Sequence, residues 1–362
     1  MQKLFVFACV GFIMALIMMP LARSIAIRYG LIDRPTGRKR HEGNVPLSGG
    51  MVFYTCLMLA TPFMPSSNML LALQVVFLPV FLLGIVDDRF GLSAWLRLSA
   101  QIVVGLVLVV GFDIKIVQLD GILSSAAITM SVFVASVFTV FCVCGVINAM
   151  NMVDGVDGLL GSLAVISFGA LGFLSFGRSE VDALLAFFAV GVLGGYLLFN
   201  TGLFGSKRLI FMGDSGSMLV GVVMVVLLID TSQQGVISPT SAGWLLGLPL
   251  LDAVSVMVRR VHKGLSPFAA GRDHMHYVLQ DAGLSPRRSL SFLVVCQLLF
   301  VGVGMLANTM EHYQMVFFWL FVVVTIGQIF LVSILSQSND DGEPASAIIT
   351  YGTLLSVLRT RD

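Results

Sequence analysis

The sequence predicts an all-α membrane protein, a polytopic helical bundle of about eleven transmembrane helices. Of its 362 residues, 57% are hydrophobic and only 11% are charged, whereas soluble domains carry about 25% charged residues. The mean hydropathy is +0.97. Apolar runs of about 20 residues, the length of one bilayer crossing, recur along the chain. We therefore expect one integral membrane domain over residues 1–362, ending in a cytoplasmic tail at 336–362.

Eleven apolar runs can be separated by the polar stretches between them. The run from Leu4 to Leu21 lacks the small-residue cleavage site of a removable signal peptide, so it counts as the first span. The expected spans cover residues 4–22, 49–64, 69–86, 96–112, 128–147, 158–176, 183–203, 211–229, 241–258, 290–309 and 315–335.

Charge is distributed unevenly between the two sets of loops. Of the 21 basic residues, only Lys3, Lys115 and Arg178 lie on one side of the predicted membrane. Basic residues concentrate on the cytoplasmic side of membrane proteins, which predicts an outside N-terminus and a cytoplasmic C-terminus. All the notable polar clusters then face the cytoplasm. The net charge of +1 gives no indication of nucleic-acid binding.

One polar stretch, residues 145–158, stands between two apolar runs. It sets Asn148, Asn151, Asp154 and Asp157 three residues apart. A charged group at bilayer depth costs several kcal/mol, about 2.5–3.5 for Asp at a helix centre, so these groups belong at an edge or a cavity. We expect a helix that runs out into a polar loop and binds Mg²⁺ and a phosphorylated ligand. A capped helix junction remains the structural alternative.

Two adjacent carboxylates, Asp87 and Asp88, close the third apolar run. They are candidates for metal contact or for a general base, and the alternative is a solvated helix end with Arg89 as counter-ion.

The stretch from Phe211 to Ser217 opens the eighth span with small residues. Its free backbone N–H groups predict an anion-attracting helix N-terminus. Asp214 there is either an N-cap or a ligand of Mg²⁺, which is usually held by one or two carboxylates together with substrate phosphates.

Two cytoplasmic loops carry further candidates. The loop at 30–50 contains a basic run with Lys39, which either sets topology and contacts anionic lipid or recognises a phosphate. The loop at 259–288 places His274 and His276 beside Arg272, a set suited to a diphosphate. Zinc is disfavoured because no Cys lies near. Asp252, inside the ninth span, is either paired with a cation or holds a residue of the site in place without contacting the ligand itself.

Taken together, these clusters resemble the polyprenyl-phosphate N-acetylhexosamine-1-phosphate transferases. The resemblance covers almost the whole chain in order and rests on Asp87-Asp88, the Asn148 to Asp157 stretch, Phe211 to Ser217 and the His274-x-His276 pair. One departure is Tyr277, where the family usually has a further His. The resemblance implies transfer of N-acetylglucosamine 1-phosphate from UDP-GlcNAc to undecaprenyl phosphate, with release of UMP. This would be the first membrane step of an envelope polysaccharide such as O-antigen lipopolysaccharide, and it implies a bacterial inner membrane with the N-terminus of the protein in the periplasm.

The resemblance also implies roles for individual residues. Mg²⁺, with Mn²⁺ as a substitute, would be held by Asp214, with Asp87 and Asp88 beside it. The catalytic set would be Asp87, Asp88, Asp154 and Asp157, and the substrate-binding set would be Asn148, Asn151, Phe211, Arg272, His274, His276 and Lys39. Another UDP-N-acetylhexosamine as donor, a transporter or flippase of phosphorylated lipid or nucleotide sugar, and a structural membrane subunit are the alternatives; a homodimer is left open.

Overall fold

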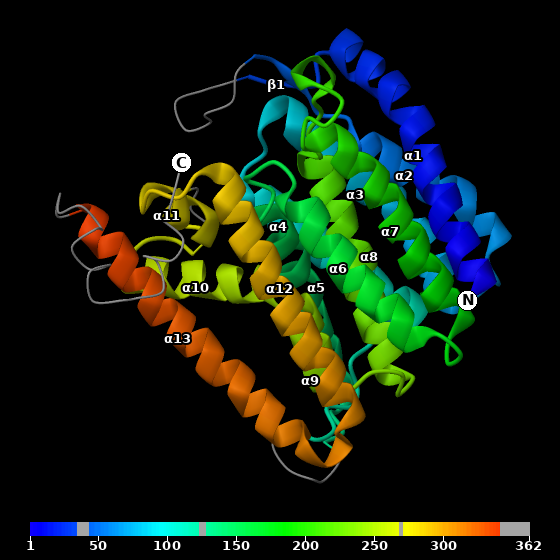
Figure 1. Cartoon of the computed structure of the whole chain (residues 1–362). Coiled ribbons are helices and arrows are strands. Elements are labelled where there is room, and N and C mark those ends of the chain that lie inside the picture. The colour runs from blue at the N-terminus through cyan, green and yellow to red at the C-terminus, as the bar shows by residue number, and fades with distance from the viewer. Residues whose placement is uncertain (35–42, 123–127, 268–270, 341–362) are drawn as a thin grey trace.

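The computed structural model describes residues 1–34, 43–122, 128–267 and 271–340. It is a helical bundle (Figure 1), and within these residues the only sheet pairs β1 (Ile32–Asp33) with β2 (Val45–Pro46) antiparallel. The all-α fold class is confirmed. The helices are α1 (Gln2–Tyr29), α2 (Gly49–Ala60), α3 (Asn68–Phe90), α4 (Ala94–Leu106), α5 (Val132–Met152), α6 (Leu159–Ser175), α7 (Glu180–Asn200), α8 (Gly213–Gln233), α9 (Pro239–Leu246), α10 (Leu248–His262), α11 (Met275–Asp281), α12 (Pro286–Thr309) and α13 (Gln314–Asp340).

Every predicted span coincides with helix, although not every helix is long enough to cross a bilayer. Among the described residues, eight helices are long and apolar enough, and the bent pair α9 and α10 raises the number to nine. Two further apolar helices, Gly49–Phe63 and Leu159–Ser175, are shorter. The count of eleven and the orientation therefore stay predictions. Helix α13 continues to Asp340, past the predicted boundary at 336, and 341–362 lie outside the described residues.

The ninth span differs from its prediction as one continuous crossing of 241–258. It is broken at Gly247, where α9 and α10 meet at 80°. Gly247 has φ 48° and ψ −116°, a conformation that side chains disfavour, and Pro249 follows in the first turn of α10, where its missing N–H does no harm. The Gly-Leu-Pro sequence at 247–249 is the local indication of this break in the sequence.

The buried side chain of Gln297 on α12 forms hydrogen bonds with the backbone groups exposed at the break. Its Oε1 accepts from the Leu248 N–H at 2.9 Å, and its Nε2 donates to the Leu245 carbonyl at 3.1 Å and to Ser167 Oγ at 2.9 Å. Backbone groups left unpaired inside a membrane cost several kcal/mol each. One carboxamide therefore satisfies the groups that the bend exposes.

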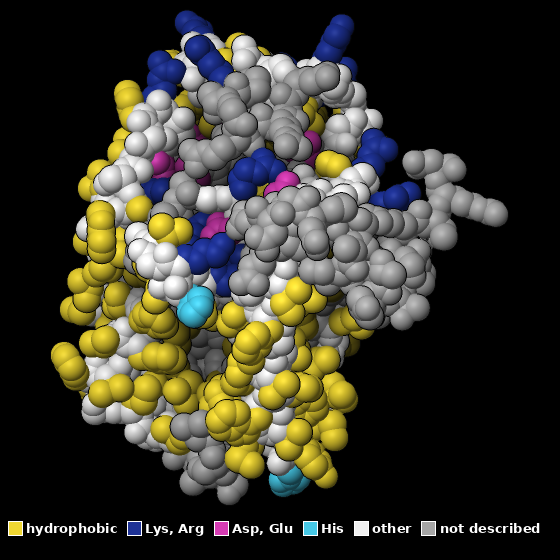
Figure 2. Space-filling model, turned by 90° about the vertical axis from the view of Figure 1, so that its left-hand side faces the viewer, with side chains coloured by type: hydrophobic (Ala, Val, Ile, Leu, Met, Phe, Trp, Pro, Cys, Tyr) yellow, Lys and Arg dark blue, Asp and Glu magenta, His cyan; other side chains and the backbone are white. Residues whose placement is uncertain are grey.

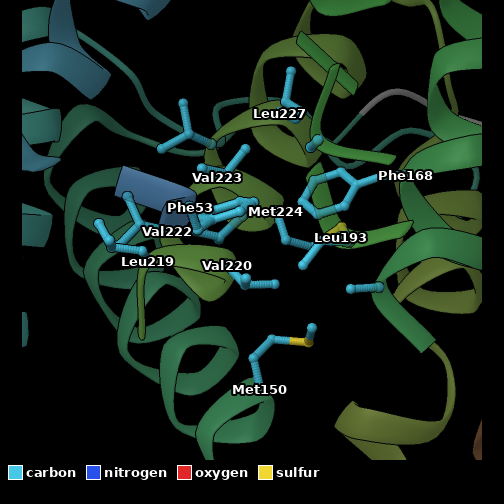
Figure 3. Close-up of a cluster of buried hydrophobic side chains, with 14 of the residues drawn as sticks. Phe53, Met150, Phe168, Leu193, Leu219, Val220, Val222, Val223, Met224 and Leu227 are labelled. Atoms are coloured by element: carbon cyan, nitrogen blue, oxygen red, sulfur yellow. The ribbon is translucent and has the colours of Figure 1, made fainter. Parts of the chain in front are cut away.

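Helix α8 forms the centre of the bundle. Figure 3 shows its side chains Leu219, Val220, Val222, Val223, Met224 and Leu227 surrounded by Phe53 of α2, Met150 of α5, Phe168 of α6 and Leu193 of α7. All ten are buried. Residues from every quarter of the helix circumference thus meet protein, and α8 has no broad face left for lipid.

The first turn of α8 is held between two glycines. A Cβ on Gly84 of α3 would lie 2.1 Å from Ser215 Cα, and a Cβ on Gly50 of α2 would lie 2.4 Å from the Gly216 nitrogen. Small residues allow membrane helices to approach this closely. The contact brings the end of α3, which carries Asp87 and Asp88, directly against the beginning of α8.

Charged side chains gather at one end of the molecule. In Figure 2 the Lys, Arg, Asp and Glu side chains lie mainly in the upper part, and hydrophobic side chains cover most of the lower surface. The upper end is the one at which β1 lies in Figure 1. This division is that of a multi-pass membrane protein with one polar end.

Candidate active site

The N-terminus of α8 is capped by Asp88 from the neighbouring helix. Asp88 Oδ1 accepts from the Asp214 N–H at 2.7 Å, and Oδ2 accepts from the Ser215 N–H at 3.2 Å and from Ser215 Oγ at 2.9 Å. The predicted attraction of an anion to this N-terminus is met within the protein, by the Asp88 carboxylate, and the prediction that these backbone N–H groups are free is wrong. Asp214 is likewise not the N-cap. Its side chain is left available for another role.

Asn151 connects the α5 motif to the α8 motif. Its Nδ2 donates to Asp214 Oδ1 at 2.6 Å and to Ser217 Oγ at 2.9 Å. A single carboxamide thus fixes one oxygen of the Asp214 carboxylate. Two sequence clusters that lie some sixty residues apart meet in this contact.

Asp87 lies beside the same carboxylate. It is buried, its Oδ1 accepts from the Leu92 N–H at 2.7 Å, and its Oδ2 lies 3.2 Å from the Arg97 guanidinium without a hydrogen-bond partner. Asp87 and Asp88 both interact electrostatically with Asp214. Within the described residues, however, no three His, Cys, Asp or Glu side chains are grouped as a metal site.

The two remaining amides at this end have structural partners. Asn148 exchanges hydrogen bonds with the buried Gln101 of α4, its Nδ2 donating to Gln101 Oε1 at 2.5 Å. Asn200 accepts from the Gly158 N–H at 2.6 Å and donates to the Ile210 carbonyl at 2.9 Å. The sequence argument missed Gln101 and Asn200, although each is a polar residue within an apolar run.

The loop after α5 carries Asp154 and Asp157. Helix α5 ends at Met152 and the chain turns until α6 begins at Leu159, so the predicted helix running out into a polar loop is confirmed. Both carboxylates interact electrostatically with the Tyr196 hydroxyl of α7. This loop begins just after Asn151 in the chain, so it lies beside the Asn151–Asp214 hydrogen bond.

The histidine loop reaches the same region from α10. The His274 and His276 rings are stacked, with centroids 5.7 Å apart and planes 6° apart. A Cβ on Gly155 would lie 2.3 Å from His276 Nε2, so this imidazole touches the loop after α5. His276 Nε2 is buried without a hydrogen-bond partner. Burial lowers the His276 pKa to about 4, and the ring is neutral near pH 7.

Arg272 is held at the edge of this loop. Its guanidinium carbon lies 4.5 Å from the centre of the Tyr277 ring, a cation–π contact, and its Nη2 lies 3.3 Å from Asp281 Oδ1. The next residue, Asp273, is bound by Arg260 at 2.5 and 2.7 Å. Burial alone would raise the Asp273 pKa, but the paired guanidinium outweighs it and the pKa falls below its ordinary value.

The remaining predicted residues are Phe211 and Lys39. Phe211 pairs through its backbone with the segment after β2, donating to the Pro46 carbonyl at 3.0 Å and accepting from the Gly49 N–H at 3.0 Å. Lys39 lies outside the described residues. The structure thus unites Asp87, Asp88, Asn151 and Asp214 directly, and it connects His276 to them through the loop after α5.

This bundle, with carboxylates, carboxamides and imidazoles gathered at one polar end, defines an integral membrane enzyme. Residues 69–232 match the model of the glycosyl transferase family 4. The undecaprenyl-phosphate alpha-N-acetylglucosaminyl 1-phosphate transferase of Escherichia coli (strain K12) is 33% identical over 317 residues, 86% of this chain and 84% of the relative. The enzymes of the same name from Salmonella typhi and Haemophilus influenzae are 34% and 36% identical, over 88% and 85% of this chain and 87% of each relative. The chain belongs to glycosyl transferase family 4, whose members depend on a metal ion for this type of reaction.

Proposed function

We propose that this enzyme transfers N-acetylglucosamine 1-phosphate from UDP-GlcNAc to undecaprenyl phosphate on the cytoplasmic face of the inner membrane. The hydrogen bond between Asn151 and Asp214 carries the proposal, because it joins two motifs into one polar site at the end of the bundle. Relatives that match most of this chain bear the name of that activity. The biased distribution of basic residues supports the cytoplasmic orientation.

The reaction requires a bond exchange at phosphorus. An oxygen of the lipid phosphate bonds to the sugar-linked phosphorus of UDP-GlcNAc, and the bond from that phosphorus to the bridging oxygen breaks. UMP leaves with the bridging oxygen and both electrons of that bond. A phosphate monoester is already largely ionised at pH 7, so the task of the enzyme is to align the phosphates and offset their charge.

The contacts of the carboxylates favour this direct route over a covalent aspartyl intermediate. Asp88 already accepts three hydrogen bonds from α8, and Asp87 is paired with Arg97. Neither carboxylate is presented as a free nucleophile. The role of Asp88 here is to fix the first turn of α8 and the position of Asp214.

Asp214 and Asp87 fit Mg²⁺, with Mn²⁺ as a substitute. The buried Oδ2 of Asp87 makes an ion pair with Arg97 but no hydrogen bond, and it lies in a carboxylate beside that of Asp214, an arrangement that a cation would stabilise further. Mg²⁺ commonly uses one or two carboxylates plus substrate phosphates. When bound, the ion would offset charge on the transferring phosphate. Asp88 is the weaker ligand of the three because of its capping bonds.

The histidine loop suits the donor diphosphate. The buried, neutral His276 has a ring nitrogen without a partner, and Arg272 supplies a fixed positive charge nearby. Asp154 and Asp157 shape the nucleotide site, and Phe211 is a candidate for the uracil. Lys39 and Asn148 remain predicted substrate contacts, although the Asn148 amide is paired with Gln101.

The test is a transfer assay. Membranes containing the protein are incubated with undecaprenyl phosphate and a panel of radiolabelled UDP-sugars, and lipid-soluble label is counted. We expect label from UDP-GlcNAc and loss of at least about 100-fold in the folded variant Asp214→Asn, which keeps the side-chain size but removes the charge. Movement of intact UDP-sugar or lipid across vesicles, without transfer, would instead establish the transporter.

Orientation is tested separately by cysteine labelling. Lys207 and Lys263 are exposed at the polar end, and Glu311 is exposed at the opposite end. Cysteines at 207 and 263 should react with an impermeant thiol reagent only from the cytoplasm, and one at 311 only from outside. The reverse pattern would contradict the proposed cytoplasmic site.

A further inference from the structure

Asp252 connects the bent span to the histidine loop. It lies on α10, is 2% exposed, and contacts two consecutive residues of that loop. Its Oδ2 lies 2.9 Å from His274 Nδ1, and its Oδ1 accepts from the Met275 N–H at 2.8 Å. One carboxylate therefore caps the first turn of α11 and fixes the imidazole that precedes it.

Two other titratable side chains near Asp252, Arg259 and His276, make no hydrogen bond to it. Arg259 interacts with it electrostatically, but donates a hydrogen bond to the Asp273 carbonyl. His276 also senses its charge, yet burial keeps that ring neutral. His274 is thus the side chain that the Asp252 carboxylate binds directly.

This contact constrains the chemistry of the His274 ring. A carboxylate accepts hydrogen bonds, so Nδ1 must carry the proton in the pair. Nε2 can then donate to a phosphate oxygen only when both ring nitrogens are protonated, and an adjacent carboxylate stabilises that cation. The parallel stack with His276 keeps His274 within the donor region of the site.

We propose that Asp252 is a positioning residue for the transfer reaction, holding the proton on His274 Nδ1 and balancing the charge of His274 while its Nε2–H binds the donor diphosphate. With the donor bound, the His274 ring would then supply its Nε2–H, and the neutral His276 ring would supply its unpartnered nitrogen. The inference rests on the proposed function, because it needs a diphosphate donor in this site.

A double-mutant cycle tests it on the purified protein in detergent. Binding of UDP-GlcNAc and of UMP is measured by calorimetry for the native protein, Asp252→Asn, His274→Ala and the double variant. Asp252→Asn keeps an acceptor for the Met275 N–H but loses the charge. We expect it to weaken UDP-GlcNAc binding by roughly tenfold, the value of a charge-assisted hydrogen bond, and to change UMP binding less than about twofold.

The same substitution should have no further effect in the His274→Ala background, because coupled residues are not additive. The buried Ser255→Ala on the same helix is the matched control, and should leave both affinities unchanged. Equal weakening of UDP-GlcNAc and UMP, or an undiminished effect without His274, would overturn the role of Asp252 and leave the transferase standing. Failure of the native protein to bind UDP-GlcNAc would instead overturn the proposed function.

A second measurement does not depend on how the Asp252 variant folds. Nitrogen-15 NMR of histidine-labelled native protein reports which ring nitrogen is protonated, and the His274 signal is identified by its absence in His274→Ala. A proton on Nδ1 without ligand, and on both nitrogens with UDP-GlcNAc bound, is the expected result. An unprotonated Nδ1 would overturn the inference.

Discussion

Substitution of Gly84 by Ala should strongly lower the activity of the enzyme, although it adds only one methyl group to α3. The new Cβ would lie 2.1 Å from Ser215 Cα and 2.5 Å from the Ser215 nitrogen, whereas ordinary contacts begin at 3.4 Å. Both atoms belong to the backbone, so no side-chain rotation relieves the clash. Helices α3 and α8 must therefore move apart by more than an ångström.

The expected cost follows from the contacts that span this interface. Overpacking of this kind costs about 1–3 kcal/mol of stability. The Asp88 hydrogen bonds to Asp214 and Ser215, now 2.7 to 3.2 Å long, cannot persist after such a shift. Displacement of catalytic groups by about 1 Å can cost about 100-fold in rate. We expect a folded but less stable protein with kcat lowered about 100-fold.

The transfer assay and thermal unfolding in detergent give the two readouts. Gly169→Ala on α6 is the matched control, because a Cβ there meets nothing within 4 Å. It should keep its activity and gain about 0.5–1 kcal/mol from the better helix former. If Gly84→Ala retains more than half of the native kcat, the close approach of α3 and α8 does not position the site.

Gln297→Leu should lower the unfolding midpoint, since it leaves the Leu248 N–H and the Leu245 carbonyl unpaired at about 1–3 kcal/mol each; an unchanged midpoint would show that the break needs no repair. The pKa of His276 falls from 6.5 to about 4 on folding, so the stability it contributes is complete above pH 6.5 and is lost as the pH falls toward 4. His276→Asn should flatten acid unfolding over that window, and an identical pH profile would refute this. Tyr277→Phe should bind UDP-GlcNAc normally, whereas Tyr277→Leu should bind it more weakly by releasing Arg272; equal affinities would exclude the ring contact.

Apolar run length was sufficient to locate the helices, because each crossing must satisfy its backbone internally. The break at Gly247 escaped this reasoning: hydropathy stays high through a bend when Gln297, fifty residues away, supplies the missing partners. The conformation of Gly247 depends on that tertiary contact as much as on the local sequence.

The residue types that gather in the candidate site could be predicted from the sequence, but their individual contacts could not. Asp88 and Asp214 look equivalent in the sequence, each a carboxylate at a span end. The structure separates them, because Asp88 faces the backbone donors of α8 while Asp214 is the residue whose N–H is capped. Only the packing of α3 against α8 makes that distinction. In the same way, the Asp252 partner His274 lies across a loop that no periodicity describes.

The central position of α8 also bears on how the protein is made. Among the eight long candidate spans it has the lowest hydropathy, 1.8, and its apolar window is the most buried, at 89%. A segment of this kind gains little from entering lipid alone, and its cap, Asp88, belongs to a helix synthesised earlier. Helices α2, α3 and α5 are synthesised before α8, and in the folded protein they surround it in place of lipid. The proposed site at the polar end cannot form before α8 docks, because Asp214 lies in its first turn.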